Sequence, residues 1–114
     1  HNVSFVVENP LTSMLWKFPR LVQLFKRANA VAVRVDFCQF GMPWRKSTKL
    51  VGNLSNLHSL EAKCTGKLCS ASNKAHFRLE GRDDNGVFWT KRAEPYPPKL
   101  CFQIAKLVAA NNSL

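Results

Sequence analysis

The segment Val31–Asn53, VAVRVDFCQFGMPWRKSTKLVGN, predicts a β-arm around which the rest of the chain is organised. Its first residues, VAVRV, carry β-branched side chains at alternate positions, which is typical of a strand. Leu50-Val51 predicts a second, short strand that returns along the first. Between the two, Gly41 can take a backbone conformation closed to other residues, and Pro43 removes a backbone donor, so a corner interrupts the strand pairing.

The corner places an aromatic and two cationic side chains next to one another. We expect it to expose Trp44, Arg45 and Lys46, and to contact an anion or a base through them, with Lys49 as a further nucleic-acid contact. Trp44 is either a stacking platform for a base or a partly buried packing residue. The cations are either phosphate and base contacts or part of an ordinary solvated turn.

Composition limits the classes of protein to which the chain can belong. With 114 residues it is one small domain or a piece of a larger one, and 46% hydrophobic residues exclude disorder as the main state. The 17 Lys and Arg against 7 Asp and Glu give a net charge of +10, which favours a polyanionic partner, most commonly nucleic acid. A basic ribosomal or capsid-type surface is the alternative. No apolar run approaches the roughly 20 residues of a membrane span, and we expect an intracellular protein with no membrane partner.

The first half of the chain predicts a strand, a broken helix and a strand. Val3–Val7 is a continuous apolar run of the kind buried in a parallel sheet, and Val31–Phe37 is the second strand. Pro19 divides the helix between them into Leu11–Lys17 and Pro19–Ala28. Such a βαβ unit is parallel by default, so we expect an α/β fold with a partial Rossmann-like sheet.

Glu8 and Asn9 are expected beyond the carboxyl end of the first strand, with Pro10 in the first turn of the helix. Ligands of open α/β sheets bind at that end of the strands. Glu8 is therefore either a ligand-binding carboxylate or simply a favourable charge at a helix N-terminus.

The second half predicts a loop-rich insertion and a closing helix. We expect residues 1–53 to hold the βαβ unit and the arm, 54–92 the insertion, and 93–114 the closing helix. Within the last two parts we expect a short helix capped by Ser55, a surface loop over Lys63–Lys74, a hairpin of strands His76–Leu79 and Val87–Trp89, and a helix over about Pro98–Ala110. Because the sequence begins at His1 rather than Met, we expect a processed or excised chain.

The cysteines suggest a metal site. Cys64-x4-Cys69-x6-His76 could bind zinc tetrahedrally, with Cys38 or His58 as the fourth ligand, although this is not one of the strong zinc spacings. A loop with free thiols is the alternative, and two disulfides would need an oxidising compartment. Cys101 is expected to be a small buried hydrophobe.

Three blocks in order resemble the C-terminal half of a C5-cytosine DNA methyltransferase domain. Phe5–Pro10 is similar to the family's strand ending in Glu-Asn-Val, and Asp36–Gly52 to its Tyr-Gly-Val-Pro-Gln-x-Arg-x-Arg segment with the strand that follows. Ala93–Pro98 is similar to the Gly-Asn-x-Val-Pro-Pro block that closes the domain. Shortened methyltransferase-like segments of phage and mobile-element proteins resemble the chain more closely, through Cys38-Gln39-Phe40-Gly41 and Lys46-Ser47-Thr48.

The resemblance implies a site that holds a cytosine flipped out of the stack. It assigns Glu8 to the base's N3 and exocyclic amine, and Arg45 or Lys46 to the charge that develops on the ring. Lys46 aligns with the first Arg of the family segment, so Glu8 and Lys46 are the expected catalytic pair. It also implies that Asn9 and Pro97 contact S-adenosylmethionine, that DNA rather than RNA is the partner, and that the protein acts in a nucleus, virus or mobile element.

The chain departs from the family in the parts that carry the chemistry. It has no Gly-rich cofactor loop, no Pro-Cys nucleophile loop, and Thr48 in place of the second Arg. Catalysis would therefore require another segment or chain that completes the site. The alternatives are a degenerate, non-catalytic nucleic-acid-binding or structural module of a ribonucleoprotein or mobile-element protein, and a zinc-stabilised interaction domain.

Overall fold

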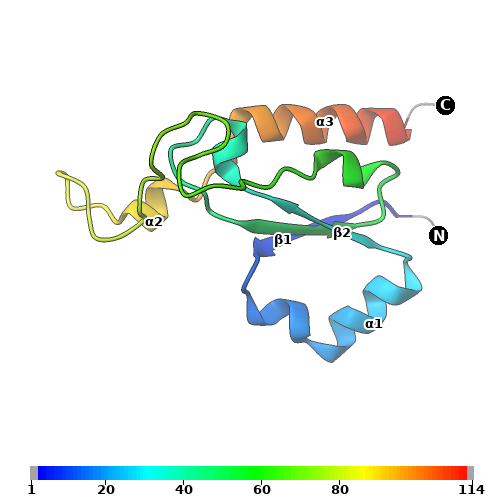
Figure 1. The fold of residues 1–114 in the computed structure, drawn as a ribbon. Helices are drawn as coiled ribbons and strands as arrows, with labels where there is room; N and C mark the ends of the chain where they lie inside the picture. Colours follow the sequence, from blue (N-terminus) through cyan, green and yellow to red (C-terminus); the bar gives the residue numbers. More distant parts are fainter. Residues whose placement is uncertain (1–2, 113–114) are drawn as a thin grey trace.

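A computed structural model describes residues 3–112 as a small sheet with helices on both of its faces (Figure 1). Residues 1–2 and 113–114 lie outside the described range. The sheet has the order β1 (Val6–Pro10), β3 (Thr48–Gly52), β2 (Val31–Val35), and β3 pairs antiparallel with both neighbours. The expected combination of helices and a β-sheet is confirmed.

β1 and β2 run in the same direction, as expected of a βαβ unit, but the expected pairing between them is wrong. β3 lies between β1 and β2, so that Gly52 is opposite Val6 on one side and Val31 on the other. Four of the five β3 residues are buried, which explains the central position of this strand. Gly52 is required there, since a Cβ atom at this position would collide with the backbone oxygen of Phe5.

The expected break at Pro19 is confirmed, but the segments before it differ from expectation. The first helical piece is a 3-10 turn, η1 (Met14–Lys17), and α1 (Pro19–Arg27) follows. Pro10 is the last residue of β1 rather than part of a helix, because the pairing with β3 continues to Thr48. Glu8 and Asn9 therefore lie within the strand, not beyond its end as predicted.

The loop-rich insertion contains little regular structure. Its short helix, η3 (Leu57–Leu60), is confirmed, but the N-cap residue is Asn56, with φ of 65°, rather than Ser55. The predicted strands His76–Leu79 and Val87–Trp89 are wrong. Between residues 68 and 88, β-pairing is limited to two isolated bridges, Leu68 with Ala75 and Arg82 with Phe88. Trp89 begins the short helix α2 (Trp89–Arg92).

The closing helix α3 (Pro98–Asn112) is confirmed and covers one face of the sheet, whereas η1 and α1 lie on the other (Figure 1). The main core forms between α3, the sheet and two 3-10 turns, η2 (Phe37–Phe40) and η3; its buried residues are Val33, Val35, Phe37, Leu50, Leu54, Leu57, Leu60 and Leu100. Cys101 is exposed, contrary to expectation, because it lies on the solvent side of α3 next to the buried Leu100. No helix among residues 3–112 is long and apolar enough to cross a membrane.

Candidate metal centre

Four side chains with metal-binding atoms converge beside the corner of the β-arm. The sulfurs of Cys38, Cys64 and Cys69 and a ring nitrogen of His76 all lie within 4.8 Å of one another. Cys64 Sγ and His76 Nε2 lie 3.3 Å apart. The predicted trio is therefore brought together, and Cys38 rather than His58 is the fourth member.

Backbone contacts fix where each of the four residues lies. Cys38 is in the first turn of η2, directly after β2. Cys69 is held in a tight loop by two hydrogen bonds. Its amide donates to Lys74 O at 2.7 Å, and its carbonyl oxygen accepts a hydrogen bond from Asn73 N. His76 is placed by the next residue, Phe77, whose amide donates to Pro43 O at 2.8 Å. We call residues 63–76 the metal loop.

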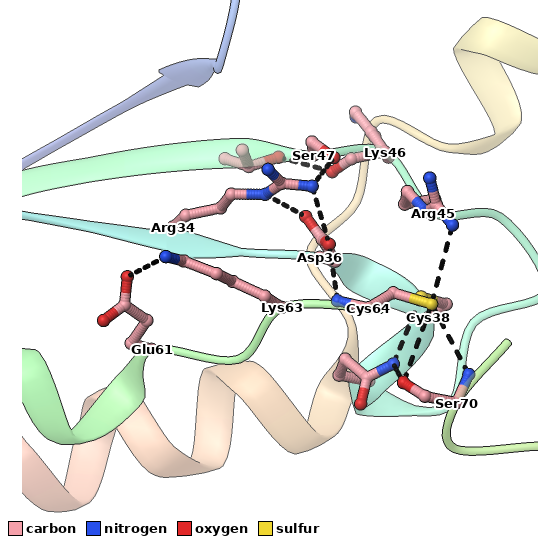
Figure 2. A network of polar contacts seen from close by, with 12 residues as sticks. Arg34, Asp36, Cys38, Arg45, Lys46, Ser47, Glu61, Lys63, Cys64 and Ser70 are labelled. Atoms are coloured by element: carbon pink, nitrogen blue, oxygen red, sulfur yellow. Dashed lines mark hydrogen bonds and ion pairs between the residues drawn. The ribbon is translucent and has the colours of Figure 1, made fainter. Parts of the chain in front are cut away.

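The start of the metal loop is tied to the sheet through a buried carboxylate. Asp36, which is fully buried, accepts hydrogen bonds from Arg34 Nε at 3.0 Å and from the amide of Cys64 at 2.7 Å (Figure 2). Burial alone raises the pKa of Asp36, but the hydrogen bonds from Arg34 and Cys64 outweigh it, and the pKa is lowered. An ionised Asp36 thus holds Cys64 in place.

The three thiols lie in different electrostatic environments. Hydrogen bonds from the backbone amides of Gly66 and Ser70, and then from Ser70 and Arg45 side chains, lower the pKa of Cys64 to about 5. Burial raises the pKa of Cys69, but the amides of Ser72 and Ala71 outweigh burial and bring it to about 7. Burial raises the pKa of Cys38 to about 12. Donors to sulfur in this number are typical of thiolates that bind a metal.

The geometry suits a tetrahedral ion. Two sulfurs at about 2.3 Å from a central zinc ion lie about 3.8 Å apart at the tetrahedral angle. The spread of up to 4.8 Å found here would close with small rotations of the side chains. All four cysteines are free thiols, so the disulfide alternative is not realised in this structure. Three sulfurs and an imidazole form a closed set with no open position, which is the pattern of structural rather than catalytic zinc sites.

The sequence did not predict that the residues around the ligands support the cysteines. Gln39 Nε2 donates to Ser70 Oγ at 3.0 Å and lies 3.5 Å from Cys38 Sγ, and Arg45 Nη2 lies 3.7 Å from Cys64 Sγ (Figure 2). Arg45 also donates to Gly66 O at 2.5 Å. No motif marks these supporting roles, because they depend on how the metal loop folds back over the corner.

The corner residues are less exposed than predicted. Trp44, Arg45 and Lys46 are each half-buried, and Trp44 packs against the main core with a buried Nε1 that has no hydrogen-bond partner among the described residues. The corner is covered because the metal loop and α2 fold over it. Gly41 has the expected left-handed conformation, with φ of 91°.

The predicted catalytic pair meets at two aromatic rings. Lys46 Nζ lies 5.2 Å from the ring centroid of Phe37, and that ring packs edge-on against Tyr96 at 6.1 Å. Tyr96 has a raised pKa, first through burial and then through its hydrogen bond to Glu8. Lys46 has a left-handed φ of 38° and donates from Nζ to Ala93 O at 2.6 Å. Glu8 and Lys46 thus lie on the two sides of one aromatic pair.

The remaining predicted residues are dispersed. Asn9 faces Lys49 across the β1–β3 pairing, and Lys49 Nζ lies 5.0 Å from the ring of Trp16. Pro97 is buried at the start of α3. Comparison of the chain with models of protein families, with curated proteins and with solved structures found no match.

Proposed function

We propose that the chain is a nucleic-acid-binding domain whose loop-rich half is held together by a structural zinc ion. The observation that carries the metal part is the convergence of Cys38, Cys64, Cys69 and His76 within 4.8 Å. Zinc is the ion of choice because thiolates with imidazole in a closed tetrahedral set suit it better than oxygen-seeking cations.

The packing indicates that a zinc ion would serve to order the metal loop. The only other cluster of buried apolar residues besides the main core, within the described chain, consists of the three cysteines themselves. Three small side chains cannot provide the burial that orders a loop, since each ordered residue costs about 1–2 kcal/mol of backbone entropy. Metal–ligand bonds can provide it, because the free energy of binding structural zinc becomes folding free energy.

Arg45 supports the assignment. Zinc with three thiolates and a neutral imidazole carries one net negative charge, and the guanidinium of Arg45 lies 3.7 Å from Cys64 Sγ. A cation at this distance stabilises the thiolate and the loaded site together.

The nucleic-acid part rests on charge. The protein has a net charge of +10, and four of its seven acidic residues are already in ion pairs with Arg or Lys. The remaining cations have no acidic partner among the described residues. Polyphosphate strands are the partners to which such a surplus is suited.

Metal analysis of protein purified without added zinc tests the first part. We expect about one zinc ion per chain, retained in Cys101→Ser and lost in Cys64→Ser and Cys69→Ser. Cys101 is the matched control because it is a free thiol outside the cluster. A wild-type protein without stoichiometric metal, with melting temperatures equal in the three variants, would rule the zinc ion out.

Binding to a single-stranded DNA oligonucleotide over a range of salt concentrations tests the second part. We expect log K to fall linearly with log salt concentration, by roughly 0.7 per phosphate contacted. Absent binding to DNA and to RNA of the same sequence, or binding that salt leaves unchanged, would contradict it.

A second candidate follows from the aromatic pair between Glu8 and Lys46. The left-handed φ of Lys46, a backbone state rare for a residue with a side chain, is the kind of strain that concentrates at functional sites. It favours a role for Glu8 and Lys46 in holding a cytosine, in a C5-cytosine methyltransferase-like domain with a partial Rossmann-like sheet completed by another segment or chain. Glu8→Gln should then abolish any preference for oligonucleotides with an unpaired cytosine over those with an unpaired uracil. Equal binding of both by the wild type would exclude this candidate.

A further inference from the structure

Two hollows with basic linings flank the metal loop. One, of about 430 Å³, is lined by Lys74 and Lys99 together with Gln39, Ser72 and residues of the corner. The other, of about 410 Å³, is lined by Arg45, Lys67 and Arg78 beside Ala75 and His76. Neither lining contains an Asp or Glu residue. Hollows of this size accept a phosphate or a nucleotide.

The two hollows are neighbours. Ala75 lines both of them, so they are separated only by the strip of backbone that runs from Lys74 to His76. This strip is fixed by the bridge between Leu68 and Ala75 and by the hydrogen bond from Cys69 N to Lys74 O. The cations on its two sides are therefore held at one separation whenever the metal loop is folded.

The cations of the first hollow are free to meet an anion. Lys74 and Lys99 form no ion pair among the described residues. Lys99 extends over Gly41, where a Cβ atom would lie at an ordinary contact distance of 3.7 Å from Lys99 Nζ, and both residues line the hollow. The Gln39 amide and the Ser72 hydroxyl add polar groups to the same lining.

The second hollow is similar in its chemistry. Lys67 has no acidic partner among residues 3–112, and Arg78 is 3.7 Å from Glu80 in a pair whose side chains are 84% and 75% exposed. A pair this exposed contributes little and is easily exchanged for a phosphate. Arg45, which donates a hydrogen bond to Gly66 O, also lines this hollow.

We propose that one nucleic-acid strand crosses the metal loop with successive backbone phosphates in the two hollows, the first bound by Lys74 and Lys99 and the second by Lys67 and Arg78. This assignment rests on the proposed nucleic-acid binding and gives it a location. Phosphate contacts of this kind position a strand without reading its sequence. The zinc ion then has an indirect role in binding, because the loop that it holds separates the two hollows.

Charge-matched double variants test the location. Lys74→Gln/Lys99→Gln and Lys67→Gln/Arg78→Gln each remove two cations from one hollow. The control, Lys17→Gln/Arg20→Gln, removes two exposed cations from η1 and α1, which lie on the face of the sheet opposite to α3 (Figure 1). All three have the same net charge, so differences between them report position rather than total charge. Zinc content and melting temperature, equal to those of the wild type, would verify folding.

The readout is the affinity for a mixed-sequence single-stranded DNA oligonucleotide, and its salt dependence. Each hollow variant should lose roughly tenfold in affinity at 0.15 M salt and lower the slope of log K against log salt by about 1.4, at 0.7 for each cation. The control variant should stay within about twofold of the wild type, because charges beyond the screening length of about 8 Å contribute little. Combining the two hollow variants should multiply the losses.

Two results would overturn the location. If wild-type protein binds DNA and the hollow variants bind as tightly as the control, the proposed function stands and this surface is wrong. If inorganic phosphate binds with saturation at matched ionic strength and the oligonucleotide stays bound, the hollows bind separate anions rather than one strand. Absence of DNA and RNA binding by the wild type would end both proposals.

Discussion

The carboxylate of Asp36 accepts a 2.7 Å hydrogen bond from the backbone amide of Cys64, across 28 residues of sequence. Asp36 directly follows β2 and precedes one metal-site cysteine by two positions, while Cys64 is itself a member of the cluster. The sheet and the metal loop are therefore joined by a charged group that lies between them.

Replacing Asp36 should destabilise both the fold and the metal site. Asp36→Ala leaves Arg34 and the amide of Cys64 without their acceptor, and we expect a loss of about 3 kcal/mol in the free energy of unfolding, from urea titrations. Asp36→Asn, which keeps an acceptor, should lose less. Glu61→Ala is the control, since the Glu61–Lys63 pair is exposed and should contribute less than about 1 kcal/mol. Equal effects for Asp36→Ala and Glu61→Ala would contradict this role.

Arg45→Met should weaken zinc binding without unfolding the sheet. In the proposed zinc site, the guanidinium would balance the negative charge of three thiolates on zinc, and it donates to Gly66 O within the loop. We expect the zinc affinity, from competition with a chelator, to fall by about tenfold, as outer-shell changes commonly do. Arg78→Met, a change of the same size at an exposed position, should leave it unaltered. An unchanged affinity in Arg45→Met would show that the charge is balanced elsewhere.

Removing the zinc ion should open the metal loop selectively. A chelator is expected to make residues 63–76 sensitive to proteases, while the sheet keeps its protection, because the main core contains no residue of that loop. Hydrogen exchange read by mass spectrometry separates the two regions. Loss of protection in β3 at the same rate as in the metal loop would mean that the ion supports the whole fold.

The turn around Asp83 should depend on pH in the acid range. The amide of Val87, then Arg92 and the amide of Asn85, hold the pKa of Asp83 below its usual 3.8. A carboxyl with a lowered folded pKa stabilises the turn above pH 3.8, and this contribution is lost as the pH falls through the lowered value. Carbon NMR of the Asp83 carboxyl should show a midpoint below 3.8, and Arg92→Gln should raise it. A midpoint that does not move would mean that the 2.8 Å Arg92–Asp83 contact does not act on the charge.

Leu50→Ala should be among the most damaging changes in the sheet. Leu50 is fully buried in the main core at the centre of β3. Truncation of such a residue costs about 2–5 kcal/mol, which chemical denaturation can measure. Val31→Ala is the control on the same sheet, because Val31 is 45% exposed, and it should cost less than about 1 kcal/mol. Comparable losses would indicate that the core is centred elsewhere.

The sequence predicts local features of this fold better than its pairings. The break at Pro19, the left-handed Gly41 and the helix from Pro98 follow from constraints within a few residues. The position of β3 does not, because strand order depends on contacts between residues 38 to 46 positions apart, from Pro10 with Thr48 to Val6 with Gly52. The default of parallel pairing for a strand–helix–strand unit fails when a later strand enters between the two.

The candidate metal site was likewise predictable where its residues are close in the sequence. Cys64, Cys69 and His76 lie close together in the sequence, so their spacing suggested a site. The choice of Cys38 over His58 depends on the fold, since η2 turns Cys38 toward the metal loop and η3 carries an exposed His58. The exposure of Trp44 was overestimated because its side chain packs against the main core, which the sequence of the corner alone does not indicate.

The order of the strands has a consequence for how the protein is made. Until residues 48–52 have left the ribosome, the segments of β1 and β2 lack the strand that pairs with both of them. This three-stranded sheet therefore cannot form until β3 has been synthesised and pairs with β1 and β2.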